Sequence, residues 1–366
     1  MPSFTNQFLT NEYTEVIQKL IKEIVNDPST YQGSRLLPSV ALPVNKVRTE
    51  VIEASGGVTL EHVPGTDPKY VQSFGTRVQE FSPPKYKECI HYDEDKLLFL
   101  RELGNNARNV RGVQKYIDLD IDRLNRRLEA RIELERWNSI FNGGFTWMGK
   151  TFSYGIPSAN RVTPVSGQPW SSDGLNANNS ASPIKDLRFW TQGGTARFRK
   201  YKIGKIWMNP NTARWLLDNS GTTSFVTSYG ANPVLTSYDV NKVLQFLIPG
   251  LPAVEVYNGW YQTESVDADG HITVSDAVFF IPDGYLFFEV SSLPGGDKIG
   301  EFVQTVQLAE GTIDAPGVGK FLLVEDNTAP GTQGGPKNPY VDLIAGVYGG
   351  VNLSRAFDVL TAYVGP

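Results

Sequence analysis

The stretch of sequence that decides the fold is NNARNVRGVQKYIDLDIDRLNRRLEARIELERWNSIFN, residues 105–142. Apolar side chains recur in it every three or four residues, which is the period of one face of an α-helix. No proline interrupts the stretch, and Asn142-Gly143-Gly144 is a typical helix end. We therefore predict one helix of roughly 36 residues, about 54 Å long, where an average helix has about 12 residues.

The two sides of this predicted helix differ in chemistry. The charged side carries both signs, and its most conspicuous basic residues are Arg123, Arg126, Arg127 and Arg131. The apolar stripe should pack against strands of its own domain, and it consists of Val113, Ile117, Ile121, Leu124, Leu128 and Ile132.

The composition excludes several classes of protein. Of 366 residues, 40% are hydrophobic and 20% charged, which is enough for a sizeable core and excludes a disordered chain. The single cysteine, Cys89, excludes a disulfide framework, and three histidines leave little for zinc or triad chemistry. The net charge of -5 argues against a surface that coats nucleic acid. We expect no catalytic residue, cofactor or metal, and no apolar run is long enough for a membrane helix.

The chain as a whole predicts an α+β fold. Strands with many turn residues precede the long helix, and helices alternate with strands after it. We divide it into a short helix and proline-containing arm (1–45), an extended β loop (46–90), a domain with the long helix (105–142) and a hairpin (145–157) within 91–182, a compact α/β domain (183–290), and returning strands (291–366).

Residues Gly144–Thr151, GFTWMGKT, match the phosphate-binding P-loop pattern letter for letter. A P-loop needs a buried strand before it and a helix after it. Here a helix comes before, and the following FSYGIP contains a glycine and a proline that prevent a helix. We interpret the match as a hairpin turn.

Two acidic clusters resemble ligand sites only in part. The segment Asp267–His271 opens like a calcium loop, but Val278 occupies the position where a glutamate is required, so we favour a hairpin turn. Asp93, Glu94 and Asp95 lie near His91 and Cys89 and could bind a metal or act as an acid–base pair, but acids also suit a helix N-terminus, which we favour. Cys89 is expected to be a buried or inert thiol.

The densest basic run covers residues 197–205. Such a run can contact phosphate, face solvent or form ion pairs with a second subunit, and the sequence leaves these three alternatives open. Its members, interleaved with Phe198 and Tyr201, are Arg197, Arg199, Lys200, Lys202 and Lys205.

A series of short motifs accompanies these elements in chain order. They are Ser55-Gly56-Gly57, Pro64-Gly65, Asp93-Glu94-Asp95-Lys96, Phe141-Asn142-Gly143, Gly149-Lys150, Tyr154-Gly155-Ile156-Pro157 and Pro336-Lys337-Asn338-Pro339. In this order the chain resembles the major capsid protein E family of lambda-like tailed phages. The resemblance covers most of the chain, and residues 158–330 match in layout only.

The resemblance implies the Hong Kong 97-type capsid fold. This fold has an N-terminal arm, an extended β loop, a peripheral domain with the long helix (the spine helix), and an axial domain at the capsomer centre. It implies a structural protein and no enzyme. The extended loop and the arm would lie on an adjacent subunit, and Arg123, Arg126, Arg127 and Arg131 would pair with acids on a neighbour.

The function that follows from the resemblance is self-assembly into the pentamers and hexamers of an icosahedral phage head that encloses double-stranded DNA. The partners would be further copies of the chain, portal and scaffolding proteins, and DNA held without sequence-specific binding, with no membrane. A decoration protein is left open. The protein would be located in the virion capsid after assembly in the host cytoplasm.

Two alternatives stay open at this stage. An encapsulin-like compartment shell would use the same fold and enclose protein cargo. A soluble hydrolase or carbohydrate-binding protein would instead line a ligand cleft with Trp190, Trp207 or Trp215, although tryptophans are more often core residues.

Overall fold

A computed structural model describes residues 31–53, 75–93, 95–96, 110–195, 198–228, 244, 248–266, 272–291, 298–307, 317–326 and 340–366. The chain forms two compact units. Unit 1 is made of Met1–Val47, Glu80–Glu135 and Phe302–Asn352, and unit 2 of Arg48–Gln79, Arg136–Glu301 and Leu353–Pro366. Each unit therefore depends on pairing between segments that are far apart in the sequence.

The longest element is helix α5, Val110–Asn142, with 33 residues. The first residues of the predicted helix lie outside the described part of the chain. The helix ends at Gly143, which has a φ of 66° and donates its backbone N–H to the carbonyl of Ser139 at 3.1 Å. Glycine takes this left-handed conformation without the steric cost of a Cβ atom, so the helix stops where the sequence predicts.

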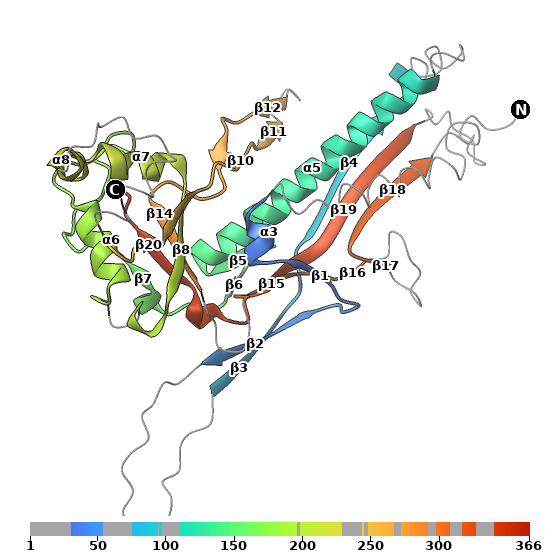
Figure 1. Cartoon of the computed structure of the whole chain (residues 1–366). Helices are drawn as coiled ribbons and strands as arrows, with labels where there is room; N and C mark the ends of the chain where they lie inside the picture. The colour runs from blue at the N-terminus through green and yellow to red at the C-terminus, as the bar shows by residue number, and fades with distance from the viewer. Residues whose placement is uncertain are drawn as a thin grey trace, which may run out of the picture. The chain divides into compact units, whose positions relative to one another are not determined.

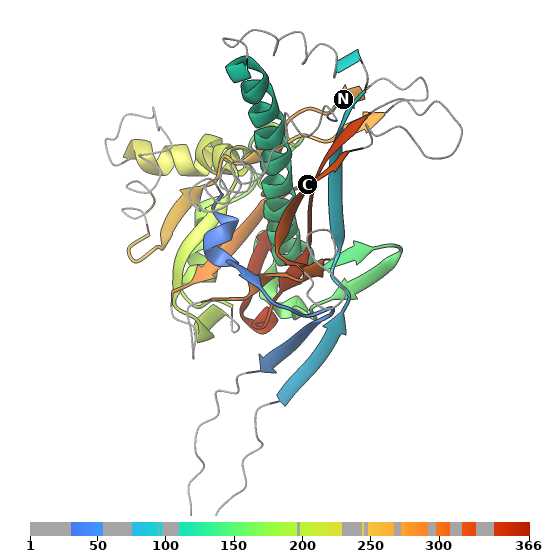
Figure 2. The same cartoon turned by 90° about the vertical axis from the view of Figure 1, so that its right-hand side faces the viewer.

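Unit 1 is built on a five-stranded sheet whose longest strand is β19 (Val341–Asn352). Strands β18 (Lys320–Asp326) and β4 (Lys85–Tyr92) pair antiparallel with β19, one on each side. The sheet is completed by β15 (Glu301–Gln304) and the edge strand β1 (Ser39–Ala41). Helix α5 runs alongside β4 and β19 (Figures 1 and 2).

The described part of the arm, from residue 31 on, joins this sheet. The short helix α3 (Gly33–Leu36) comes first, and β1 then pairs parallel with β15, with Ser39 opposite Phe302. The flanking backbone also bonds to this strand, since the N–H of Leu42 donates to the carbonyl of Gln304 at 2.8 Å. Because β1 is an edge strand, the neighbouring prolines are tolerated.

Unit 2 contains a second five-stranded sheet, in the order β7-β20-β14-β8-β9. Strand β14 pairs antiparallel with both β8 and β20, whereas β8 with β9 and β20 with β7 are parallel pairs. The strands are β7 (Arg161–Val162), β8 (Ile203–Met208), β9 (Ala253–Val256), β14 (Tyr285–Val290) and β20 (Leu360–Tyr363).

Three helices accompany this sheet, namely α6 (Pro183–Thr191), α7 (Pro210–Asp218) and α8 (Ser220–Ser228). Trp190 of α6 packs edge-on against Phe288 of β14, with ring centroids 6.0 Å apart. Helix α7 begins at a proline after Asn209, whose side chain accepts the N–H of Thr212 at 2.7 Å. This cap satisfies one of the free N–H groups at the helix start.

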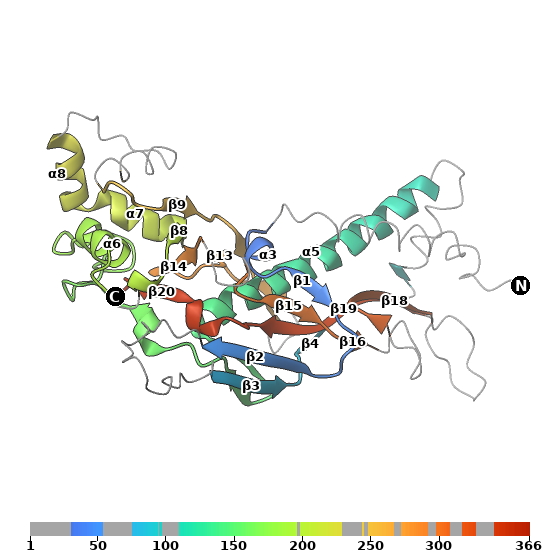
Figure 3. The ribbon, with the colours of Figure 1, turned by 60° about the horizontal axis from the view of Figure 1, so that its bottom comes forward.

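Several two-stranded ribbons extend from the units. Strands β2 (Val47–Glu53) and β3 (Gly75–Phe81) lie side by side (Figure 3). Three further ribbons belong to unit 2, namely β5–β6 (Gly144–Trp147, Lys150–Ser153), β10–β13 (Trp260–Tyr261, Val278–Phe279) and β11–β12 (Glu264–Val266, Ile272–Val274). The ribbon β16–β17 (Val306–Gln307, Gly317–Val318) belongs to unit 1.

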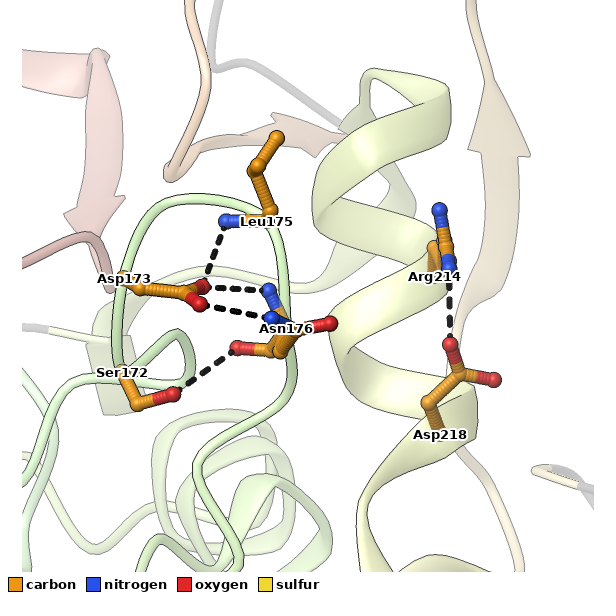
Figure 4. A network of polar contacts seen from close by, with 6 residues as sticks. All are labelled: Ser172, Asp173, Leu175, Asn176, Arg214 and Asp218. Atoms are coloured by element: carbon orange, nitrogen blue, oxygen red, sulfur yellow. Dashed lines mark hydrogen bonds and ion pairs between the residues drawn. The ribbon is translucent and has the colours of Figure 1, made fainter.

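The long polar loop before α6 is held by its own hydrogen bonds. The Asp173 carboxylate accepts the backbone N–H groups of Leu175 and Asn176 at 2.9 and 2.7 Å (Figure 4). These bonds stabilise the charged form and lower the pKa of Asp173. Further along, the buried Asp186 of α6 accepts the indole N–H of Trp170 at 2.8 Å, which ties the loop to the helix.

In α7, Arg214 and Asp218 form a surface ion pair (Figure 4).

Candidate assembly surfaces

The apolar stripe of α5 is largely buried. Ile121, Leu124, Leu128 and Ile132 are each less than 5% exposed, and Ile117 is half-buried. Val113 lies in the helix, but the surroundings of its side chain are outside the described part. The helix therefore buries one continuous row of aliphatic side chains over at least three turns, as the spacing predicts.

Polar side chains on both flanks of the stripe connect α5 to the unit 1 sheet. Arg127 donates to both carboxylate oxygens of Glu88 on β4, at 2.5 and 3.0 Å. Lys320 on β18 forms an ion pair with Glu129. Since β4 and β18 flank β19 over Val341–Val347, the stripe between these contacts faces this part of the sheet.

The four arginines of the charged side differ in their surroundings. Arg127 is matched by Glu88, and Arg131 contacts Glu135 one turn along at 2.8 Å. Arg126 pairs with Asp122 at 2.7 Å but stays largely exposed, and Arg123 is also exposed. Arg126, Arg127 and Arg131 thus each have an acidic partner within the chain, and of these three Arg126 has the most exposed side chain, at 76%.

A buried acid on α5 was missed by sequence reasoning. The Glu133 carboxylate is fully buried and accepts the backbone N–H of Gly33 at 2.7 Å. A Cβ atom at Gly33 would lie 2.6 Å from the second carboxylate oxygen, so only glycine fits there without a shift. Burial, with Glu133 as a second cause, raises the pKa of Tyr31 nearby. The signal in the sequence was an acid directly beside Ile132 of the apolar stripe.

The ribbon β2–β3 carries the described part of the predicted extended loop. Val47, Thr49 and Val51 are buried, whereas Arg48 and Glu50 between them are exposed, so β2 covers one face and leaves the other open. On β3, Val78 is an exposed apolar side chain. The ribbon ends before Lys85, because β4 from there on belongs to the unit 1 sheet.

The basic run is only partly exposed. Residues Phe198–Lys200 form the 3-10 helix η2. Phe198 is buried against Phe288, with ring centroids 5.1 Å apart. Lys205 on β8 pairs with Glu255 on β9 at 2.7 Å. Arg199, Lys200 and Lys202 face solvent, and Arg197 lies outside the described residues.

The motifs that resemble ligand sites have structural explanations. The P-loop match forms the antiparallel hairpin β5–β6, and Met148 and Gly149 have the positive φ values of its turn. Asp93 accepts the backbone N–H of Lys96 at 2.9 Å, as expected at a helix start. The calcium-like segment Asp267–His271 lies outside the described residues, and within those residues no three His, Cys, Asp or Glu side chains gather as a metal site.

Cys89, which was expected to be a buried or inert thiol, is exposed on β4. Partial desolvation and the nearby Asp342 carboxylate raise the pKa of its thiol. A raised pKa lowers the thiolate fraction and therefore the nucleophilicity at neutral pH. In the described part of the chain, no helix is long and apolar enough to cross a bilayer.

One protein family matches most of the sequence. The family described as phage major capsid protein E matches residues 14–309, which includes α5, the ribbon β2–β3 and the unit 2 sheet up to β14. The chain belongs to this family. Among curated proteins, none matches the sequence.

The fold of a phage capsid protein is also found by comparison with solved structures. A crystal structure of a prophage protein of E. coli CFT073, assigned as a capsid protein, has a TM-score of 0.54 at 11% identity and covers 96% of this chain and 98% of its own. Two further solved structures are less similar. One is a phage-related protein from Bordetella bronchiseptica RB50, with a TM-score of 0.47 and 13% identity over 94% of this chain and 96% of that chain. The other is a virus-like particle from Pyrococcus furiosus, with a TM-score of 0.44 and 12% identity over 96% of this chain and 99% of that chain.

The predicted α+β capsid fold is therefore confirmed for this member of the phage major capsid protein E family. The alternative of a ligand cleft lined by tryptophans is wrong, because Trp190, Trp207 and Trp215 are all buried in unit 2. The indole N–H of Trp207 donates to Glu289 at 2.7 Å, as expected for a core tryptophan with a polar end. The family is a structural one, so the protein has a structural role in a capsid.

Proposed function

We propose that this phage major capsid protein E builds the pentamers and hexamers of an icosahedral phage head that encloses double-stranded DNA. The family match over residues 14–309 is the observation that carries the proposal. The folded chain also has the features of a subunit that assembles, since it leaves a ribbon and a charged helix face open to a neighbour.

Within this proposal, unit 1 acts as the peripheral domain and unit 2 as the axial domain at the capsomer centre. The long helix with its apolar stripe supports the first assignment, and the compact α/β sheet with α6, α7 and α8 supports the second. The ribbon β2–β3 would lie over an adjacent subunit. A two-stranded ribbon is marginally stable alone, so a neighbour's surface would stabilise it.

The partners of the shell follow from the same proposal. Portal and scaffolding proteins would direct assembly in the host cytoplasm, and DNA would be enclosed without sequence-specific contacts. The net charge of -5 supports this, since a strongly basic protein would bind the packaged DNA tightly. The exposed Arg123 and Arg126 would meet acidic side chains of a neighbouring subunit.

The test is expression of the full chain with negative-stain electron microscopy and size-exclusion chromatography. Closed particles of megadalton mass are expected. A protein that stays monomeric at all concentrations, with and without the scaffolding protein of the same phage, would contradict the proposal. Particles from infected cells should contain DNA, and particles that hold a protein cargo instead would assign the chain to the encapsulin-like alternative.

A further inference from the structure

Unit 2 carries two exposed surfaces of opposite charge that have no role in the proposed function as stated above. The first, here called the acidic ribbon, is formed by β10–β13 and β11–β12. Its exposed apolar side chains are Trp260 (52% exposed), Val274 (55%) and Val278 (47%), accompanied by the exposed acids Glu264 and Asp276. The described residues 258–266 and 272–278 contain no lysine or arginine.

The second surface, here called the basic face, is formed by the end of α6 and by η2. These elements adjoin, because Arg199 donates its side-chain N–H to the carbonyl of Gly193, just after α6. Lys202 follows directly, and its carbonyl accepts the N–H of Ser291 at 2.7 Å. The exposed side chains of the basic face are Arg188, Phe189, Arg199, Lys200 and Lys202.

The acids near the basic face already have partners within unit 2. Asp358 is buried and accepts the hydroxyl of Tyr201 at 2.7 Å, and Glu255 pairs with Lys205. Lys200 and Lys202 make no ion pair among the described residues. The basic face therefore has charge that the chain itself does not compensate.

The two surfaces lie at opposite ends of the same pair of strands. Strands β8 and β9 run parallel, with Lys205 opposite Ala253 and Met208 opposite Val256. The basic face immediately precedes β8, whereas the acidic ribbon immediately follows β9 and leaves the sheet at its other end (Figure 1). Six residues of β8 separate the ends by about 20 Å at about 3.3 Å per residue. The two surfaces of one subunit therefore cannot pair with each other.

We propose that the acidic ribbon of one subunit docks on the basic face of the next copy of the chain in the capsomer. This inference rests on the proposed function and names the surfaces that join neighbouring units. Opposite charges at opposite ends produce a head-to-tail contact, and such a contact closes into a ring when each step rotates by a fixed angle. Trp260 and Phe189 supply the apolar part of the contact, since exposed aromatic side chains are typical of the centres of interfaces.

The experiment uses charge reversal in the full chain. Glu264→Lys with Asp276→Lys reverses the ribbon, and Lys200→Glu with Lys202→Glu reverses the face. Each double variant should lower the yield of closed particles by about tenfold or more, because like charges then meet. Combining all four substitutions in one chain should restore closed particles. Lys298→Glu, an exposed lysine elsewhere in unit 2, is the matched control and should assemble normally.

A mixture of the two double variants tests whether the contact joins different copies. Neither variant can pair with itself, but the reversed ribbon of one fits the reversed face of the other. The two variants would then alternate around the ring, which is possible in a ring of six subunits and impossible in a ring of five. The mixture should therefore form hexamers and few closed shells, which native mass spectrometry can measure.

The outcomes separate this inference from the proposed function. If the wild-type chain forms no particles under any condition, the proposed function fails. If the wild type and both double variants all assemble equally, only the docking inference is overturned. Normal particles with less DNA from the face variant would assign the basic face to DNA, and this result also overturns the inference.

Discussion

The buried carboxylate of Glu133 in α5 accepts the backbone N–H of Gly33 at 2.7 Å, across 100 residues of sequence. This bond fastens the start of the arm to the long helix within unit 1. It also explains a glycine at position 33, because a Cβ atom there would overlap the carboxylate. The bond thereby holds the chain just ahead of β1, which pairs at the edge of the sheet.

Gly33→Ala should destabilise the unassembled subunit by about 1–3 kcal/mol, because the added methyl group overlaps a buried side chain. Glu133→Ala should cost a similar amount, since it leaves the Gly33 N–H without its acceptor. The double variant should cost less than the sum, because removing the carboxylate makes room for the methyl group. Urea denaturation measures all three. Strict additivity would mean that the two residues do not interact.

Leu124→Asp should prevent folding of the subunit. Truncating a buried leucine already costs about 2–5 kcal/mol, and an unpaired buried charge adds to that cost. Leu119→Asp is the matched control on the same helix, because Leu119 is 55% exposed and Leu124 only 2%. Circular dichroism and solubility distinguish the two. A folded Leu124→Asp variant would contradict the packing of the stripe.

Val78→Lys should leave the subunit folded and reduce shell formation. Val78 is half exposed on β3, so its replacement costs little in the isolated subunit, whereas a ribbon that lies over a neighbour would have to bury the new charge. Val165→Lys, at a similarly exposed valine in a loop of unit 2, should assemble normally. Electron microscopy of both variants decides, and equal shell yields would argue against the ribbon's role.

The stability of the unassembled subunit should depend on pH through Lys320. Burial lowers the pKa of this lysine from its ordinary value of 10.5 to about 8. Between these two values the unfolded chain binds more protons than the folded one, so stability should rise as pH increases from about 8 to about 10.5. The gain is at most about 3.4 kcal/mol, since one pKa unit corresponds to about 1.36 kcal/mol. The Glu129 carboxylate stabilises the charged lysine and reduces this gain.

Urea midpoints measured across this pH range test the effect. Lys320→Met should remove the rise, whereas Lys185→Met, at an exposed lysine of α6, should leave it unchanged. A wild-type protein whose midpoint does not change over the range would indicate that the ion pair with Glu129 fully offsets the burial of Lys320.

Features with a short-range physical cause were predictable from the sequence. The spacing of the apolar residues gave the helix and its buried side, since a period near 3.6 places them on one face. The hairpin at the P-loop match followed from the glycine and proline after it, and the burial of Trp190, Trp207 and Trp215 followed from the preferences of large aromatic side chains.

Pairings between distant segments were not predictable, and only the tertiary structure decided them. A strand's alternation shows which side is buried, but it does not name the partner strand, so the addition of β1 to β15 was missed. The charged side of the predicted helix indicates that its charges need partners, but it does not identify these partners. Glu88 and Gly33 come next to α5 only when the chain folds. The sequence by itself thus determined the long helix, the core-forming residues and the family of this protein. The tertiary structure decided which charges are compensated within the chain, because that depends on distances between atoms that the sequence does not contain.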